Sequence, residues 1–398
     1  MAFSYKVGSI TSPASTGNQA TTGVGFQPKI VLFFANPATA DGANGFSRNF
    51  FGAGVSSSSR FAIDENNNND TATHTASKCF VVTGAGSVTI DADLVSLDAD
   101  GFTVNWTTVS SGMIVQYVAL GGADLSNVAI KQFTSPTSTG NQATSGVGFQ
   151  PDAVIFASIG QSTAPPNLFS ADVPFALGAM TSTGQGTAVR DFDAGGQRSY
   201  QRTNAALATV VNAAKQLEAS YVSLDADGFT LNFTTVDASA RYIWAICLKG
   251  GQYKVGSFDK PTATGNAGTT GVGFTPVGEF FWSYGVASST TIADNGGRYS
   301  VGFASSSSNR GTWATSATGA SRANLDRTVA LRMENSGTTT GVADFVSQDA
   351  DGFTLNWTTA DATARQILYM AFGSAAATNA FMPGTGDPNL SLHNSMAN

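Results

Sequence analysis

Pairs of aspartates separated by one residue occur in three copies of one motif. The pairs are Asp98 and Asp100 in SLDADGF, Asp225 and Asp227 in SLDADGF, and Asp349 and Asp351 in SQDADGF. Paired carboxylates could bind calcium or act as acid and base. An EF-hand loop, however, needs further oxygen ligands and a glutamate at its twelfth position, whereas an apolar strand pattern follows each pair here. Asp-Gly between two alternating segments is instead the strongest short-range signal of a β-hairpin. We therefore predict a turn at each pair, and neither a metal site nor catalytic carboxylates.

A glycine motif also occurs three times, as TGVGF from Thr22, SGVGF from Ser145 and TGVGF from Thr270. Its glycines suggest a phosphate-binding loop, but it lacks the Lys and Ser/Thr ending of a P-loop. It also precedes an apolar strand pattern, and not a helix whose N-terminus could hold an anion. We interpret the motif as a turn or bulge that leads into the next strand.

No reactive constellation accompanies these motifs. The chain has two histidines, His74 and His393, and neither recurs in another copy, so a Ser-His-Asp triad would depend on an unrepeated residue. We expect both histidines to be exposed. No nucleophile-elbow motif occurs, and the ligands of a zinc site are missing. The sequence therefore favours a protein that is not an enzyme and that holds no cofactor or metal.

Carbohydrate binding is the remaining chemistry that the residue types allow, because Ser, Thr, Asn and aromatic residues are frequent. Trp106 and Trp357 alternate with apolar residues and so belong to the core, which leaves Trp282 and Trp313 of the third copy as candidates for glycan stacking. The other interpretation, which we favour, gives all five tryptophans a role in the scaffold.

The composition is that of an all-β chain with an uncharged surface. Only 12% of the 398 residues are charged and 42% are hydrophobic, which argues against disorder. The net charge of −7 and the lack of Lys and Arg clusters argue against nucleic-acid binding. No segment approaches the ~20 apolar residues that span a membrane, and no signal peptide is visible. Cys79 and Cys247 occupy unrelated positions, so we expect two buried free thiols and synthesis in a reducing cytoplasm.

Whole domains repeat along the chain. STGNQATTGVGFQPKIVLFF from Ser15 recurs almost unchanged from Ser138 and in a diverged form from Ala263, and SLDADGFTVNWTT from Ser96 recurs in the same way. Because both ends of the unit recur in register, we expect three homologous domains at 1–122, 123–251 and 252–373, followed by an extended arm at 374–398. The joints between the units are short, so their relative orientation should be fixed; a compact ring and a linear array both remain open.

Each unit should be an antiparallel β-sandwich of jelly-roll type. Phe102, Val104 and Trp106 alternate with polar residues, as in a strand with one buried face, whereas IVLFF from Ile30 is apolar throughout and should be covered on both sides. Asn204–Ser220 has helical propensity, but its place in the repeat predicts a strand. The eight strands expected in the first unit lie near Tyr5–Ile10, Lys29–Ala35, Phe51–Val55, Phe61–Asp64, Cys79–Thr83, Asp93–Asp98, Phe102–Val109 and Met113–Leu120.

Two kinds of segment are expected to contact partners. The loops Asn36–Asn49, Ser158–Pro174 and Ser283–Gly297 share no sequence although the frames around them do, and function usually diverges in such loops. The C-terminal arm is polar and interrupted by proline, and we expect it to dock onto a neighbouring subunit or, alternatively, onto its own third unit. Its anchors would be the five large apolar residues Phe381, Met382, Leu390, Leu392 and Met396.

TGVGFQPKIVLFF from Thr22, together with DADGFTLNWTTADATARQILYMAFG from Asp349 to Gly373, resembles repeats in structural proteins of tailed bacteriophages. The resemblance covers all three units, leaves out the arm and assigns no functional residue. It implies a non-enzymatic virion protein, made in the host cytoplasm, that decorates the capsid, forms a head fibre or is appended to the tail.

Such a protein would act by packing against other virion proteins, as a homo-oligomer within the particle, with no nucleic-acid or membrane partner. The alternative is a receptor-binding or carbohydrate-recognising tail-fibre module that binds a host-surface glycan. A hydrolase is the third class, and it lacks an acid, a base and a nucleophile in the sequence.

Overall fold

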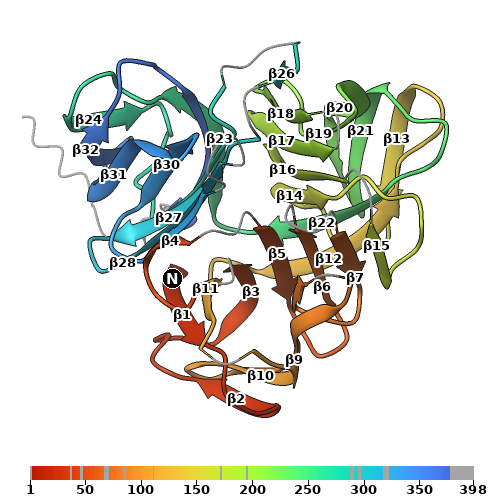
Figure 1. Ribbon diagram of the computed structural model, residues 1–398, viewed down its shortest axis with the longest axis horizontal. Coiled ribbons are helices and arrows are strands. Elements are labelled where there is room, and N and C mark those ends of the chain that lie inside the picture. The colour runs from red at the N-terminus through yellow and green to blue at the C-terminus, as the bar shows by residue number, and fades with distance from the viewer. Residues whose placement is uncertain are drawn as a thin grey trace, which may run out of the picture.

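The computed structural model describes residues 2–35, 38–44, 48–66, 71–84, 86–110, 112–170, 173–193, 196–286, 291–294, 297–316 and 322–376. Within these ranges every regular element is a β-strand, which confirms the all-β prediction. Figure 1 shows three lobes around a common centre, with β2, β13 and β24 at the periphery. The three units therefore form a compact ring, the arrangement that the sequence left open.

Each unit is a sandwich of two antiparallel sheets, an inner sheet and a smaller outer sheet. The inner sheet of the first unit contains β1 (Phe3–Thr11), β11 (Ile114–Gly122), β3 (Pro28–Ala35), β5 (Arg48–Gly54), β6 (Arg60–Asn66) and β7 (Thr71–Thr75), in this order. Its outer sheet contains β2 (Gly17–Thr21), β10 (Gly101–Thr108), β9 (Val88–Asp98) and β8 (Phe80–Thr83). All eight expected strands are present, and the structure adds the polar strands β2 and β7, which lack an apolar alternation.

The other two units have the same strand order. In the second unit the inner sheet contains β12 (Asn127–Thr134), β22 (Tyr242–Lys249), β14 (Ala153–Ser158), β16 (Val173–Thr181), β17 (Gln185–Asp193) and β18 (Gly196–Arg202), and the outer sheet β13 (Gly140–Ser145), β21 (Gly228–Thr235), β20 (Ala214–Asp225) and β19 (Leu207–Val211). In the third unit the inner sheet contains β23 (Gln252–Asp259), β33 (Gln366–Gly373), β25 (Gly278–Ser283), β27 (Tyr299–Ser306), β28 (Asn309–Ser316) and β29 (Arg322–Asp326), and the outer sheet β24 (Gly265–Thr270), β32 (Gly352–Ala360), β31 (Thr338–Asp349) and β30 (Leu331–Asn335).

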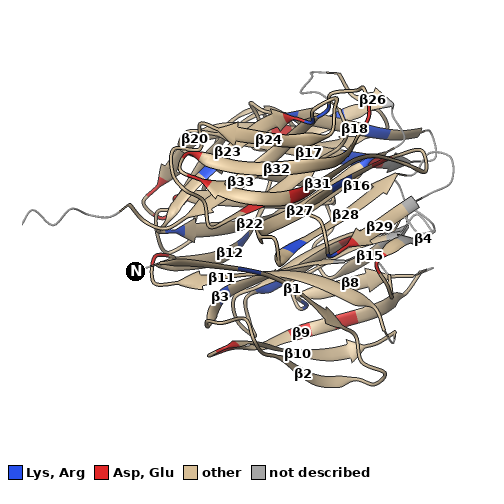
Figure 2. Ribbon diagram, turned by 90° about the vertical axis from the view of Figure 1, so that its left-hand side faces the viewer, with Lys and Arg blue, Asp and Glu red and all other residues tan. Residues whose placement is uncertain are grey.

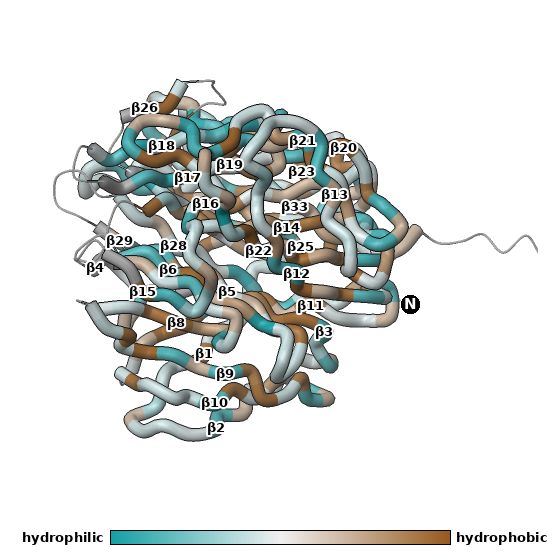
Figure 3. The backbone as a smooth tube through the Cα atoms, turned by 90° about the vertical axis from the view of Figure 1, so that its right-hand side faces the viewer, coloured by the Kyte–Doolittle hydropathy of each residue, from teal (hydrophilic) through white to brown (hydrophobic). Residues whose placement is uncertain are grey.

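The burial of the side chains along each strand can be compared with the pattern of apolar and polar residues in its sequence. In β10 the side chains of Phe102, Val104 and Trp106 are buried and alternate with half-buried polar ones, as predicted. The segment with helical propensity forms the hairpin of β19 and β20 instead, because Asn212 and Ala213 turn the chain with φ of 52° and 62°. Figure 3 shows the contrast in hydropathy between brown, apolar strands such as β3 and β8 and the pale strand β2.

Adjacent units exchange a short strand. β15 (Asn167–Ser170) of the second unit pairs with β7 of the first, and β26 (Ala293–Asp294) of the third pairs with β18 of the second. β4 (Gly42–Asn44) of the first unit pairs with β29 of the third, which closes the ring. All three exchanged strands lie in the variable loops, so these loops contact a neighbouring unit of the same chain; contacts with an external partner stay a prediction.

The inner sheets share one hydrophobic core around the ring axis. The largest cluster of buried side chains takes residues from all three units. Phe34 of the first unit lies 4.3 Å from Phe303 of the third, measured between ring centroids, and Phe61 stacks on Trp244 of the second unit at 4.9 Å. Apolar strands of the inner sheet, such as β3, are therefore covered on one side by the outer sheet and on the other by the shared core, as the sequence predicted. Each unit depends on the other two to bury its inner face.

The side chains at the axis differ between the units. One set of equivalent positions, defined by strand register, holds Phe34, Ala157 and Trp282, and another holds Ile63, Ala188 and Trp313. In both sets the second unit has the smallest residue and the third unit the largest, so bulk in one unit fills the space that another leaves. The units are therefore not interchangeable.

One layer of the axis is polar and also asymmetric. The equivalent positions hold Glu65, Arg190 and Thr315, whose exposed fractions are 2%, 0% and 0%. Arg190 Nη1 donates to Thr315 Oγ1 at 2.9 Å. Desolvation lowers the pKa of Arg190, and the negative charge of Glu65 acts in the opposite direction. Three identical subunits with Glu or Arg at this position would bring three like charges together. A single chain instead places unlike groups at the same level.

We predict that the first unit does not fold alone. Residues 1–122 expressed by themselves would expose Phe34, Phe51 and Phe61, which are buried in the shared core, and an apolar patch of that size favours aggregation. Near-ultraviolet circular dichroism and size-exclusion chromatography should show an unfolded or aggregated fragment, with the full chain as the control. A soluble, folded, monomeric fragment would contradict the dependence of each unit on the shared core.

Candidate functional site

The two repeated motifs bind each other. The carboxylate of Asp100 accepts hydrogen bonds from the backbone amides of Gly23 and Gly25, at 3.0 and 2.6 Å. Asp227 binds Gly146 and Gly148 in the same way in the second unit, and Asp351 binds Gly271 and Gly273 in the third. The second aspartate of each pair therefore locks the hairpin turn of the outer sheet to the glycine loop.

The first aspartate of each pair is held within its own hairpin. Asp98 accepts hydrogen bonds from the hydroxyls of Ser96 and Thr103, at 2.7 and 2.8 Å, and the same contacts recur at Asp225 and Asp349. The paired carboxylates are thus engaged in the turn that the sequence predicted. Within the described part of the chain, no group of three or more His, Cys, Asp or Glu is placed to hold a metal ion.

Glycine is required in this lock for two reasons. Gly23 and Gly25 have φ of 78° and 91°, in the region that favours glycine, and this conformation lets both amides point at one carboxylate. Gly101, with φ of 154°, lies so close to β2 that a Cβ there would be 1.8 Å from the carbonyl oxygen of Thr21. The glycines are therefore structural, and the amides of Gly23 and Gly25 bind the carboxylate of Asp100.

The lock lowers the pKa of its carboxylates. Hydrogen bonds from Gly25 and then Gly23 favour the charged form of Asp100, so its pKa lies below the ordinary value. The pKa values of Asp227 and Asp351 are lowered by the equivalent amides. The backbone amides are the largest cause of the lowered pKa in all three units, and the positive charges of Lys131 and Lys254 add to it at Asp227 and Asp351.

The tryptophans proposed as glycan platforms are core residues. Trp282 and Trp313 both have an exposed fraction of 0%, because β25 and β28 turn these side chains toward the axis of the ring. The glycan-stacking prediction is therefore wrong for these two residues. The other three tryptophans, Trp106, Trp244 and Trp357, have exposed fractions of 1%, 3% and 0%, so the scaffold interpretation holds for all five.

His74 is also placed differently from the prediction. It has an exposed fraction of 1%, and it lies opposite Asn167 in the pairing of β7 with the exchanged strand β15. Its ring contacts Tyr242 edge to face at 5.8 Å. Burial lowers the pKa of His74 to about 4, so the imidazole is neutral near pH 7 and contributes to the contact between units. His393 lies outside the described residues.

The two cysteines are free and buried, as predicted. Burial raises the pKa of Cys247 to about 12 and raises that of Cys79 further. A thiol that stays protonated is a poor nucleophile. Neither cysteine therefore provides a reactive group.

The arm begins against the joints between units. Ser374 Oγ accepts a hydrogen bond from the amide of Phe3 at 3.0 Å, and the carbonyl of Ser374 accepts one from Gln252 Nε2 at 2.6 Å. The amide of Ala375 donates to Asp124 at 2.9 Å. The five apolar residues proposed as anchors, Phe381, Met382, Leu390, Leu392 and Met396, lie outside the described residues.

An exposed valine recurs at the equivalent position of all three units, outside the hydrophobic core. Val95, Val222 and Val346 have exposed fractions of 39%, 38% and 43%. Each lies at a β-bulge in the outer sheet, two residues after the position that pairs with an asparagine of the adjacent strand. The outer sheets thus present the same apolar point in three places around the ring. Figure 2 shows that the charged residues, by contrast, are few and scattered over the ribbon.

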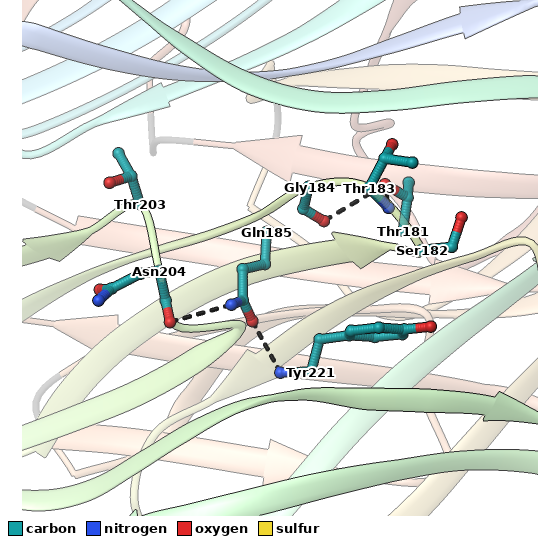
Figure 4. Close-up of a pocket in the computed structure, with 8 residues that line it drawn as sticks. All are labelled: Thr181, Ser182, Thr183, Gly184, Gln185, Thr203, Asn204 and Tyr221. Carbon is teal, nitrogen blue, oxygen red and sulfur yellow. Dashed lines mark hydrogen bonds between the residues drawn. The ribbon is translucent and has the colours of Figure 1, made fainter.

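The second unit contains a pocket, and one of its lining residues, Tyr221, directly precedes the exposed Val222. Its volume is about 270 Å³, and it is lined by Thr181, Ser182, Thr183, Gly184, Gln185, Thr203, Asn204 and Tyr221. Figure 4 shows Gln185 between Asn204 and the backbone of Tyr221, with the ring of Tyr221 extending toward the side where Thr181 and Ser182 lie. Sequence reasoning missed this pocket. The available signal was a glutamine where the register of the other units has arginine.

We predict that the aspartate–glycine lock makes stability depend on pH. Replacing Asp100, Asp227 and Asp351 together by Asn should lower the melting temperature near neutral pH. Because the folded-state pKa of each carboxylate is lowered, its contribution is present above the unfolded-state pKa of about 3.9 and is lost as the pH falls through the folded-state pKa. Thermal melts across an acid pH series should therefore show the two proteins converging at low pH.

The single variant Asp98→Asn is the control for this series, because it changes a turn carboxylate that binds hydroxyl groups and not glycine amides. A difference between wild type and the triple variant that stays constant at every pH would show that the charged carboxylates do not act through the lock.

We also predict that calcium does not affect stability. Both oxygens of Asp100 already accept hydrogen bonds from amides, so the turn offers a cation too few free ligands. Differential scanning fluorimetry should give the same melting temperature in EDTA and in calcium chloride, with a calcium-binding protein in the same buffers as positive control. A drop of many degrees in EDTA would overturn the prediction, because a tightly bound ion stabilises the folded state by mass action.

No protein-family model matches the chain, and no curated protein shows significant similarity to it. Within the described ranges, no helix is long and apolar enough to cross a membrane. What the protein does has to be inferred from its residues and their arrangement.

Proposed function

We propose that this chain is a structural protein of a tailed-bacteriophage virion, displayed on the capsid or appended to the tail, and that it acts by packing and not by catalysis. The observation that carries the proposal is a closed ring with three copies of one outer surface. The repeated carboxylates and glycines, which were the candidates for chemistry, are engaged in holding that surface together.

The comparison between the units supports a role for the outer sheets. At the axis the three copies have diverged to residues as different as alanine and tryptophan. On the outer sheets they retain Asn18, Asn141 and Asn266 opposite Asn105, Asn232 and Asn356, together with the three exposed valines. Exposed and half-buried residues of the outer sheets that stay alike while the shared core diverges fit a surface that meets equivalent partners.

The symmetry of the ring supports a place in a larger assembly. Three similar surfaces around one axis can contact three equivalent neighbours, which is the contact pattern of a threefold site in a closed assembly. A covalent ring provides this pattern without having to assemble from three subunits. We therefore propose that the chain occupies threefold or quasi-threefold positions of the particle.

The ring also has two different ends. One end carries the joints between units, the N-terminal residues and the start of the arm at Ser374 and Ala375. The other end carries the exchanged strands β4, β15 and β26 within the variable loops, as Figure 2 shows in side view. We propose that the arm end attaches to the particle and that the variable loops face outward.

We propose that the apolar residues of the arm bind a neighbouring protein of the particle. Burying each of the five large apolar side chains against a neighbour would contribute ~1.5–3 kcal/mol. Backbone pairing with an exposed strand edge of a neighbour would add to this. We propose that these contacts hold the ring on the particle.

A receptor-binding or carbohydrate-recognising module is the second candidate function. The tryptophans that first suggested it are buried, but the neutral pocket of the second unit supports it independently. A glycan array distinguishes a recognition module from a purely structural one.

We predict that deleting Ala375–Asn398 leaves the ring folded but prevents its incorporation into particles. Electron microscopy of particles made with and without the intact gene should locate three-lobed density that disappears in the deletion, and a protein stain should give the occupancy of the truncated chain. A full-length variant with serine at the five apolar positions is the matched control, because it keeps the arm's length and removes its anchors.

A truncated chain that joins particles at full occupancy would refute the arm as anchor. Particles that contain no copy of the chain at all, in a host that makes it, would refute the proposed function.

A further inference from the structure

The second unit differs from the other two at one position between its sheets. In the first unit the side chain of Arg60 donates to the carbonyl of Ser77 and forms an ion pair with Asp93 at 3.3 Å. In the third unit Arg310 donates to the carbonyl of Thr328 and forms an ion pair with Asp344 at 2.9 Å. Both arginines also donate to a carbonyl of the preceding hairpin turn. In these two units a charged pair thus fills the space beneath the turn.

Strand register places Gln185 at the position of these arginines and Ser220 at the position of the aspartates. Gln185 keeps the equivalent backbone contact, because its Nε2 donates to the carbonyl of Asn204 at 3.0 Å. Its Oε1 accepts a hydrogen bond from the amide of Tyr221 at 2.7 Å. The shorter, uncharged side chain leaves open the space that the guanidinium group fills elsewhere.

The turn above this space is also shorter in the second unit. Four residues, 181–184, separate Met180 from Gln185, whereas five residues, 55–59 and 305–309, separate the equivalent paired positions of the other two units. Gly184 packs so closely against the third unit that a Cβ would lie 2.1 Å from the carbonyl oxygen of Val255. The wall of the pocket is therefore held by a contact between units, and the pocket is formed before any ligand arrives.

We infer that this pocket binds a neutral, polyhydroxylated ligand, namely one sugar residue of a glycan. None of its eight lining residues is charged, and most offer hydroxyl or amide groups that both donate and accept hydrogen bonds. Tyr221 adds an apolar ring face with a polar end. The volume of about 270 Å³ is smaller than the ~300–1,000 Å³ of drug-sized sites, so it suits a single small ring.

The neutral lining also selects against charged sugars. A carboxylate that enters the pocket loses hydration and meets no cation among the lining side chains, which is unfavourable. A second hollow of about 380 Å³ shares Asn204 with the pocket and is lined by residues that include Arg202, Lys215 and Glu218. This hollow gives the rest of a glycan chain room to continue beyond the first sugar.

The sister units provide the variants that test the inference. Gln185→Arg combined with Ser220→Asp restores the ion pair that units one and three contain, and so closes the pocket with a pair that the fold already tolerates. Tyr221→Leu introduces the residue of the first unit, Leu94, and removes the ring. Phe345→Tyr in the third unit is the matched control, because it adds a tyrosine where Arg310 and Asp344 still fill the space.

The experiment uses the full chain with the methyl glycosides of glucose, galactose, mannose and N-acetylglucosamine, and with glucuronate as the charged counterpart. Saturation-transfer NMR and titration should show at least one neutral glycoside bound with Kd on the order of 1 mM. The double variant and Tyr221→Leu should each weaken binding by about tenfold or more, Phe345→Tyr should leave it unchanged, and glucuronate should bind more weakly than methyl glucoside.

The inference is overturned if none of the four glycosides binds at millimolar concentration, or if binding persists in both pocket variants while their circular dichroism matches wild type. Because the assay uses isolated protein, its result is independent of whether the chain is part of a virion.

Discussion

The structure depends on the mutual coverage of three apolar sheet faces. Each inner sheet is covered on one side by its own outer sheet, but on the other side only by the inner sheets of the other two units. No single unit can meet the requirement that a sheet bury its apolar face. Burial of these faces is achieved by closing the ring, by exchanging strands and by packing unlike side chains at the axis. Short linkers between units keep the inner sheets close enough to cover one another.

Because the three units belong to one chain, the side chains at the ring axis can differ from unit to unit. In a homotrimer every axial residue meets two copies of itself, so bulky or charged residues are difficult to place there. In this chain the three positions of a layer vary separately, so alanine and tryptophan occupy equivalent positions in one layer, and glutamate, arginine and threonine do so in another. The outer sheets carry no such freedom, since each must keep its own turn and glycine loop together. The units therefore differ most in the residues that contact one another at the axis, and least in the residues that hold each outer sheet together.

The sequence predicts the parts of the fold that depend on local pattern. Alternation identified β10, a continuous apolar segment identified β3 as covered on both sides, and Asp-Gly identified the turn at residues 98–101. Contacts between distant residues were not predictable in this way, because Asp100 meets Gly23 across 77 positions, and because three exchanged strands of unrelated sequence carry no common signal. The pocket was missed for the same reason, since a glutamine in place of an arginine has meaning only once the strand register is known.

Closure of the ring requires a strand of the first unit to pair with a strand of the third, which the ribosome makes much later. β4 ends at Asn44 and its partner β29 begins at Arg322, so about 280 residues must be translated before they can pair. At roughly 5–20 residues per second this takes on the order of tens of seconds. Throughout that time β4 lacks its partner strand, and the inner face of the first unit lacks the cover that the third unit provides. The nascent chain is therefore at its greatest risk of misassembly before the third unit emerges, and ribosomes closely spaced on one message would bring such unfinished chains together.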